Sequence, residues 1–181
     1  MIYPIVIFYL AAVDKINAVA KFLLGALLLW MTLATFTQVL VRFVFTNLGW
    51  TISAPWTEET ARYAMIWVVF IGLGVGFRYG LLLSLTFVAD ALSNRIGQAL
   101  RYMALATSFV FLLSIFFLGL DFVEFGRIER SPALSLPKNW IYMALPVGAA
   151  LGCINILALA ASAWHTGTDI RRAGTLLQEK D

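Results

Sequence analysis

Four long stretches without charged residues constrain the fold of this chain more than any other feature of its sequence. An α-helix needs about 20 consecutive apolar residues to cross the roughly 30 Å hydrocarbon core of a bilayer. Three of the stretches approach or exceed that length, but the second is uncharged only over residues 63–77, so the turn that carries Glu58, Glu59 and Arg62 is expected at the headgroup level. The sequence therefore predicts an all-α integral membrane protein with a single membrane domain over residues 1–181. Its four transmembrane helices are predicted at residues 22–42, 56–77, 102–120 and 139–164.

The composition supports lipid as the solvent for most of this surface. Hydrophobic residues make up 61% of the chain and charged residues 13%, whereas soluble domains average about 45–50% and about 25%. The net charge is +3, but the basic residues are scattered at the ends of apolar stretches, where topology selection places them. We therefore expect contacts with membrane lipids and no binding to nucleic acid.

The distribution of basic residues predicts the orientation in the membrane. Eight of the 13 Lys and Arg residues lie on the side that holds both termini and the connection between the second and third helices. Because cytoplasmic segments carry the excess of Lys and Arg, both termini are predicted to be cytoplasmic.

Two further segments, residues 5–21 and 83–101, alternate polar and apolar positions at helical spacing. This pattern predicts short amphipathic helices lying in the cytoplasmic interface, and the alternative is that both segments are the frayed, tilted ends of spans.

On the opposite side, two connections carry charged residues and prolines. In the first, Arg42 precedes the turn at 46–54, and Trp56, Glu58, Glu59 and Arg62 follow it. Antiparallel helices joined at this turn would bring the Arg42 guanidinium near the carboxylates, and Glu58 and Arg62 form an i,i+4 pair. We interpret this group as a clamp between the two helix ends or as an interface with a partner. The alternative is that these charged residues are simply solvated and contribute less than about 1 kcal/mol to stability.

The second connection, residues 121–138, is predicted to be an exposed loop. Its first half is charged, and its second half is held extended by Pro132 and Pro137.

The spans contain two G-x-x-x-G faces, Gly72 with Gly76 and Gly148 with Gly152, which allow close approach of helix backbones in lipid. They predict helix packing, either within this chain or against another membrane subunit.

The sequence contains no recognisable catalytic or metal-binding set. It has one histidine, His165, and one cysteine, Cys153, so neither haem ligation by two histidines nor a dithiol redox site is possible within the chain. No acidic residue lies in the middle of a predicted span, where an ion-coupling carboxylate is usually found. We expect no cofactor, no metal and no enzymatic activity.

Several blocks of the sequence together resemble the small membrane subunit of tripartite ATP-independent periplasmic (TRAP) transporters, the DctQ-like family. The resemblance covers most of the chain and agrees with its length, number of spans and orientation. A histidine common in the family around residues 82–84 is missing, although Asp90 is present. The blocks are Gln38-Val-Leu-Val-Arg42-Phe, Trp56-Thr-Glu-Glu-Thr-Ala-Arg62-Tyr, Trp67, Phe70-Ile-Gly72, Ser131-Pro-Ala-Leu-Ser-Leu-Pro137 and Trp140-Ile-Tyr-Met-Ala-Leu-Pro146-Val-Gly148.

The resemblance implies a division of labour in the bacterial inner membrane. A larger partner subunit of about a dozen spans would bind substrate and sodium, and a periplasmic substrate-binding protein would deliver solutes such as carboxylates. The small subunit would brace the large one and help to dock the binding protein, with Pro132, Pro137, Trp140 and Pro146 in its periplasmic loop and interface. Pro146 would also bend the fourth span. The alternative is a self-sufficient four-span exporter or channel.

Overall fold

The computed structural model describes residues 2–50, 53–81, 93–170, 173–174 and 177. Within these ranges the chain is mostly helical, and four helices are long and apolar enough to cross a membrane. The predicted number and order of transmembrane helices are thereby confirmed. The helices cover Pro4–Phe45, Pro55–Tyr79, Arg95–Gly126 and Asn139–Thr166.

The first two spans form a helical hairpin. Helix α1 covers Ile2–Leu40 and continues through one π-helical turn, η1, over Val41–Phe45. Helix α2 covers Pro55–Gly76 and continues as the 3-10 turn η2 over Phe77–Tyr79. Pro55 stands at the first helical position, where the N–H that proline lacks has no intrahelical partner. Gly80 then ends the helix in a left-handed conformation, with φ of 65°.

Helix α1 begins far before the predicted start at residue 22. The prediction of a separate interfacial helix over residues 5–21 is wrong, because this segment is continuous with the first span. Only Pro4 disfavours helix here, and it lies in the first turn, where proline is tolerated. Of the second predicted amphipathic segment, residues 94–101 form the first turns of helix α4, and residues 83–92 lie outside the described residues.

The last two spans form a second hairpin. Helix α4 covers Asn94–Gly126, and the short helix α5, Asn139–Tyr142, leads into α6, Ala144–Thr166. The fourth span is interrupted at Met143, three residues before Pro146. Proline has no N–H to donate to the carbonyl of the residue four positions earlier, and this residue is the last one of α5.

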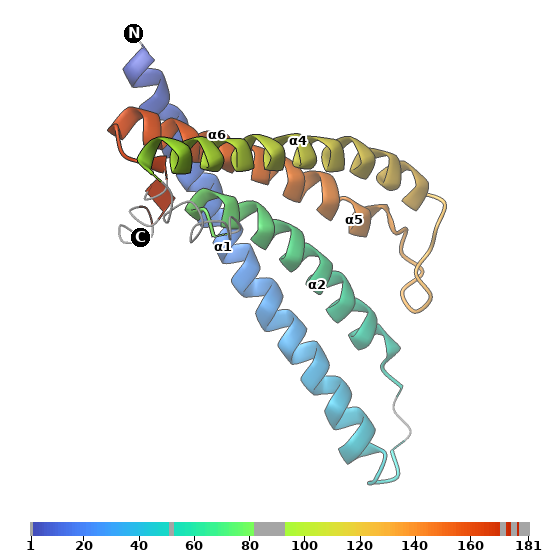
Figure 1. Cartoon of the computed structure of the whole chain (residues 1–181). Coiled ribbons are helices and arrows are strands. Elements are labelled where there is room, and N and C mark those ends of the chain that lie inside the picture. Colours follow the sequence, from blue (N-terminus) through green and yellow to red (C-terminus); the bar gives the residue numbers. More distant parts are fainter. Residues whose placement is uncertain (1, 51–52, 82–92, 171–172, 175–176, 178–181) are drawn as a thin grey trace.

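The two hairpins meet at one end of the molecule and diverge toward the other. Figure 1 shows α1 beside α2, α4 beside α6, and the start of α1 at the same end of the molecule as the end of α6. Contacts between α2 and α6 join the hairpins, and the first half of α1 also contacts α6. At the diverging end, the connection between α4 and α5 turns back toward the start of α2 (Figure 1). This return of the chain creates the site described below.

Glycines allow the close approach of α2 to α6. A Cβ atom at Gly148 would lie 2.5 Å from the Phe70 carbonyl oxygen, and one at Gly74 would lie 2.9 Å from the Gly148 carbonyl oxygen. A Cβ atom at Gly152 would lie 3.7 Å from the Gly74 Cα on α2, and 2.7 Å from a Leu112 methyl group on α4. The helix crossing therefore uses Gly148 and Gly152 together with Gly74. Gly72 instead faces α1, with its nearest neighbour a Leu24 methyl carbon at 3.9 Å, and Gly76 is buried.

A buried pair of asparagines links three helices at the end where the hairpins meet. The side-chain amides of Asn17 on α1 and Asn155 on α6 bond each other in both directions, at 2.7 and 2.9 Å. Asn155 also donates to the Gly74 carbonyl oxygen on α2, at 3.0 Å. Both side chains are buried, at 2% and 0% exposure. Buried amides satisfied in this way fix the relative position of the helices.

We expect Asn155→Leu to destabilise the chain, because it leaves the Asn17 amide buried without its partner. An unsatisfied buried polar group costs about 1–3 kcal/mol, whereas removing both partners is often nearly neutral. The double variant Asn17→Leu with Asn155→Leu should therefore recover part of the loss. Thermal unfolding of the purified chain in detergent measures both effects. A double variant that is less stable than Asn155→Leu alone would contradict this account.

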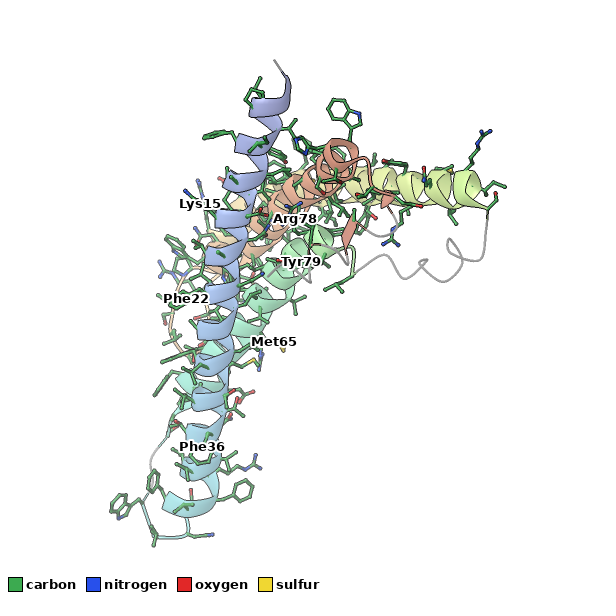
Figure 2. The ribbon with its side chains drawn as sticks, turned by 90° about the vertical axis from the view of Figure 1, so that its left-hand side faces the viewer. Lys15, Phe22, Phe36, Met65, Arg78 and Tyr79 are labelled. Carbon is green, nitrogen blue, oxygen red and sulfur yellow. The ribbon has the colours of Figure 1, made fainter. Side chains whose placement is uncertain are left out.

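An ion pair attaches α1 to the end of α2 at the same end of the molecule. Arg78 donates to the Asp14 carboxylate at 2.8 Å, and its side chain is 3% exposed whereas that of Asp14 is 60% exposed. The Lys21 ammonium lies 4.9 Å from the centre of the Tyr79 ring. Figure 2 shows Arg78 and Tyr79 beside the first half of α1. The segment before the first predicted span is thus an integral part of the fold.

Candidate functional site

The start of α2 and the loop over residues 127–138 form a compact polar site at the diverging end of the hairpins. The loop folds into a tight turn in which the Ser131 N–H donates to the Leu136 carbonyl at 2.9 Å. The Leu136 N–H donates to the Ser131 hydroxyl oxygen at 3.2 Å. Arg130 and Pro137 pair as an isolated antiparallel bridge. The predicted loop over residues 121–138 is shorter in the structure, because residues 121–126 continue α4. The remaining loop is exposed on one side and has a defined structure of its own.

Glu59 fastens this loop to α2. One of its carboxylate oxygens accepts hydrogen bonds from the N–H groups of Ala133 and Leu134, both at 2.9 Å. The other oxygen accepts a hydrogen bond from the Tyr63 hydroxyl, one helical turn further along α2. Glu59 is 8% exposed. A carboxylate that accepts several hydrogen bonds holds its donors more strongly than a neutral acceptor does, so Glu59 fixes the turn against α2.

A second carboxylate closes the base of the loop. Glu129 pairs with the Lys138 ammonium at 2.5 Å and accepts a hydrogen bond from the Tyr142 hydroxyl on α5 at 2.7 Å. The Lys138 N–H also donates to the Glu129 carbonyl at 2.9 Å. The pKa of Glu129 lies below its ordinary value, mainly because of the hydrogen bond from Lys138 and to a smaller extent because of the hydrogen bond from Tyr142. The same pair raises the pKa of Lys138.

These shifts predict that the loop loosens in acid. Because the pKa of Glu129 is lower in the folded protein, its stabilising contribution is present above the unfolded pKa of 4.5 and is lost as the pH falls through the folded pKa. The raised pKa of Lys138 keeps its contribution present below 10.5. We expect limited proteolysis within residues 127–138 to accelerate in wild type as the pH falls below 4.5. Glu129→Gln should be cleaved faster than wild type at pH 7 and should show a weaker acid dependence, because the Glu59 carboxylate still holds the turn at Ala133 and Leu134.

The predicted contact across the α1–α2 hairpin forms with a different residue. The Gln38 side chain donates to Glu58 at 3.2 Å, and Arg62 pairs with Glu58 at 2.9 Å as predicted for an i,i+4 pair. Within the part of the chain that the structure describes, Arg42 forms no ion pair with Glu58 or Glu59. Its guanidinium lies 5.7 Å from the centre of the neighbouring Phe43 ring. The η1 turn ends α1 with Arg42 exposed.

A cavity of about 440 Å³ lies between α2 and the loop. Carboxylates, cations and phenol groups surround it, together with two isoleucines and two prolines. The cavity brings Glu58, Glu59 and Arg62, which were predicted to form the hairpin clamp, next to Pro132 of the loop. The cavity is lined by Pro55, Glu58, Glu59, Arg62, Tyr63, Ile66, Pro132, Lys138, Ile141 and Tyr142.

The remaining predicted residues surround this site without entering the cavity. Trp56 and Trp140 are exposed, at 42% and 68%. Pro137 belongs to the bridge that closes the loop. Pro146 packs on α4, where a Cβ atom at Gly119 would lie 2.8 Å from its ring. Exposed tryptophans at helix ends are typical of the membrane interface.

Sequence reasoning missed most of the groups that hold the loop. Tyr63 follows Glu59 by four positions, so helical spacing was a usable signal for that contact. Ser131, Glu129 and Lys138 act through the loop conformation, which no spacing rule predicts. The described residues contain no group of three His, Cys, Asp or Glu side chains placed to hold a metal ion.

Comparisons with known proteins identify the family that this chain resembles over most of its length. The profile of the family described as "Tripartite ATP-independent periplasmic transporters, DctQ component" matches residues 31–166. The chain is 29% identical over 122 residues to the C4-dicarboxylate TRAP transporter small permease protein DctQ of Rhodobacter capsulatus, covering 64% of this chain and 52% of the relative. It is 28% identical over 146 residues to the isethionate TRAP transporter permease protein DctMQ of Oleidesulfovibrio alaskensis, covering 78% of this chain and 22% of the relative. The match thus spans about half of the first relative and about a fifth of the second.

Proposed function

The chain belongs to the DctQ family, the small membrane component of TRAP transporters, and from this we propose that it braces the large transport subunit and helps to dock a periplasmic binding protein. The family is a transporter component rather than an enzyme family, and it places the chain in the bacterial inner membrane as a multi-pass protein. A small permease subunit implies association with a large membrane subunit.

The loop fastened by Glu59 is the observation that carries the docking part of this proposal. The turn at Ala133 and Leu134 is held by a buried carboxylate rather than left free. Exposed ion pairs lie beside it, Arg62 with Glu58 on α2 and Arg127 with Glu124 at the end of α4. A preorganised surface with exposed charges of both signs suits reversible recognition of a soluble protein. With both termini in the cytoplasm, this surface faces the periplasm.

The bracing part of the proposal is supported by the apolar surface of the spans. Large apolar side chains remain exposed along α1 and α4, including Phe22, Leu29, Phe111 and Phe117. In the described residues, the ion pairs and the buried arginines lie toward helix ends and in the connecting loop. Such a chain offers surface for lipid and for other helices. Sodium and solute would bind in the large subunit, and we propose that the solute is a small organic anion such as a carboxylate.

Reconstitution in liposomes tests this function. The chain alone should not transport organic acids, and sodium-dependent uptake should appear only when its large subunit and binding protein are both present. Uptake by the large subunit and binding protein without this chain should be lost or strongly reduced. Robust transport by this chain alone would contradict the proposal and favour a self-sufficient exporter or channel.

A further inference from the structure

We propose that one exposed flank of α1 packs against a transmembrane helix of the large permease subunit. The proposal rests on the function proposed above and identifies the surface through which the small subunit is held. Positions on this flank are separated alternately by three and four residues, so they share one side of the helix. All of them are exposed. The flank consists of Gly25, Leu28, Thr32, Thr35 and Val39, and it ends at Arg42.

Two other sides of α1 have different partners. The side toward α2 holds buried and half-buried residues such as Ala20, Leu24 and Ala34. The opposite side carries a large apolar residue at every seventh position: Phe22, Leu29, Phe36 and Phe43, each 59–76% exposed. Figure 2 shows Phe22 and Phe36 along the length of α1. Bulky apolar side chains repeated in this way are suited to lipid acyl chains.

The flank itself has the composition of a helix–helix contact in a membrane. Nothing lies within 4 Å of a Cβ atom placed at Gly25, so another backbone is able to approach there. The Thr32 hydroxyl donates to its own helix, to the Leu28 carbonyl at 2.9 Å, and leaves a low, compact surface. A shallow groove of about 390 Å³ lies alongside, lined by Met31, Thr32, Thr35, Phe36 and Val39. Small and hydroxyl residues gather at such contacts because they permit close packing.

Arg42 indicates the chemistry of the partner. It is exposed at the end of the flank, and no carboxylate of the described residues pairs with it. An arginine at the membrane edge gains most from a carboxylate that accepts both of its terminal N–H groups. The geometry therefore favours a partner helix with small residues along its length and an acidic residue at its periplasmic end. In the DctMQ relative the matched segment is 22% of one permease polypeptide, so a membrane neighbour is covalently present there.

Site-specific photo-cross-linking tests the assignment in the complex with the large subunit. Benzoyl-phenylalanine is placed at Thr32 or Thr35 on the flank, and in matched controls at Leu29 or Leu33, which are 62% and 52% exposed on other sides of α1. After irradiation in membranes, adducts are identified by mass spectrometry. We expect adducts with the large subunit when the probe is at Thr32 or Thr35, and none when it is at Leu29 or Leu33.

A charge reversal provides a second measurement. Arg42→Glu should reduce the amount of co-purified large subunit at least about tenfold, because like-charge contacts cost several kcal/mol. Arg42→Lys should retain most of it.

Other outcomes overturn the assignment in distinguishable ways. Adducts with the large subunit only from Leu29 or Leu33 would show that another side of α1 forms the interface, while the proposed function stands. Adducts between two copies of this chain would identify a homodimer contact instead. Absence of protein adducts at all four positions, with the large subunit still co-purifying, would assign the flank to lipid. Failure of the large subunit to co-purify with the wild-type chain would overturn the proposed function itself.

Discussion

Replacing Gly148 with alanine is expected to separate α2 from α6 and to destabilise the whole bundle. The added methyl group would lie 2.5 Å from the carbonyl oxygen and 2.7 Å from the carbonyl carbon of Phe70. Both atoms belong to a helix backbone, so no flexible side chain is able to move away. Overpacking typically costs about 1–3 kcal/mol, and a backbone collision belongs at the upper end of that range. The midpoint of thermal unfolding should fall by roughly 6–12 °C, at about 2–4 °C per kcal/mol.

Gly25→Ala is the matched control for this variant. It adds the same methyl group to a transmembrane helix, but nothing lies within 4 Å of that position. Because alanine has the higher helix propensity, by about 1 kcal/mol, the purified chain should be as stable as wild type or slightly more stable. Similar destabilisation by both variants would mean that loss of glycine in general, rather than the crossing at Gly148, is responsible.

Replacing Glu59 with alanine is expected to release the loop from α2 without unfolding the spans. The change removes the acceptor of three donors: the N–H groups of Ala133 and Leu134 and the Tyr63 hydroxyl. Each buried donor left unsatisfied costs about 1–3 kcal/mol, less where water enters. We expect faster hydrogen exchange of the Ala133 and Leu134 amides. In reconstituted transport, a higher concentration of binding protein should be required for half-maximal uptake.

Glu58→Ala separates this effect from the loss of a negative charge. Glu58 precedes Glu59 directly, but its side chain is 58% exposed and its ion pair with Arg62 is on the surface, where such pairs contribute under about 1 kcal/mol. The Glu58→Ala variant should leave hydrogen exchange of the Ala133 and Leu134 amides unchanged. Glu59→Gln keeps one acceptor oxygen and should give an intermediate result. A Glu59→Ala variant with wild-type amide exchange, or with an altered solute preference, would contradict a docking role for this loop.

Several features of this protein follow from local sequence alone. The number and order of the spans depend on the length of uncharged stretches, because crossing a bilayer requires only a long enough apolar helix. The Glu58–Arg62 pair follows from helical spacing, and the G-x-x-x-G pattern correctly indicated close packing at Gly148 and Gly152. The start of α1 was placed too late, because charged residues mark the limit of a span but do not end a helix.

Tertiary structure decided which groups meet. Glu59 and Leu134 are 75 positions apart, and Asn17 and Asn155 are 138 positions apart. Their contacts depend on how two hairpins cross and on where a loop returns. The crossing uses Gly74 rather than Gly72, since Gly72 lies on the side of α2 that faces α1. Among the described residues it also left Arg42 without a carboxylate, and it gave Glu59 the loop as its partner. A chain's local pattern determines which segments enter the membrane, whereas the pairing of polar groups depends on packing between distant segments.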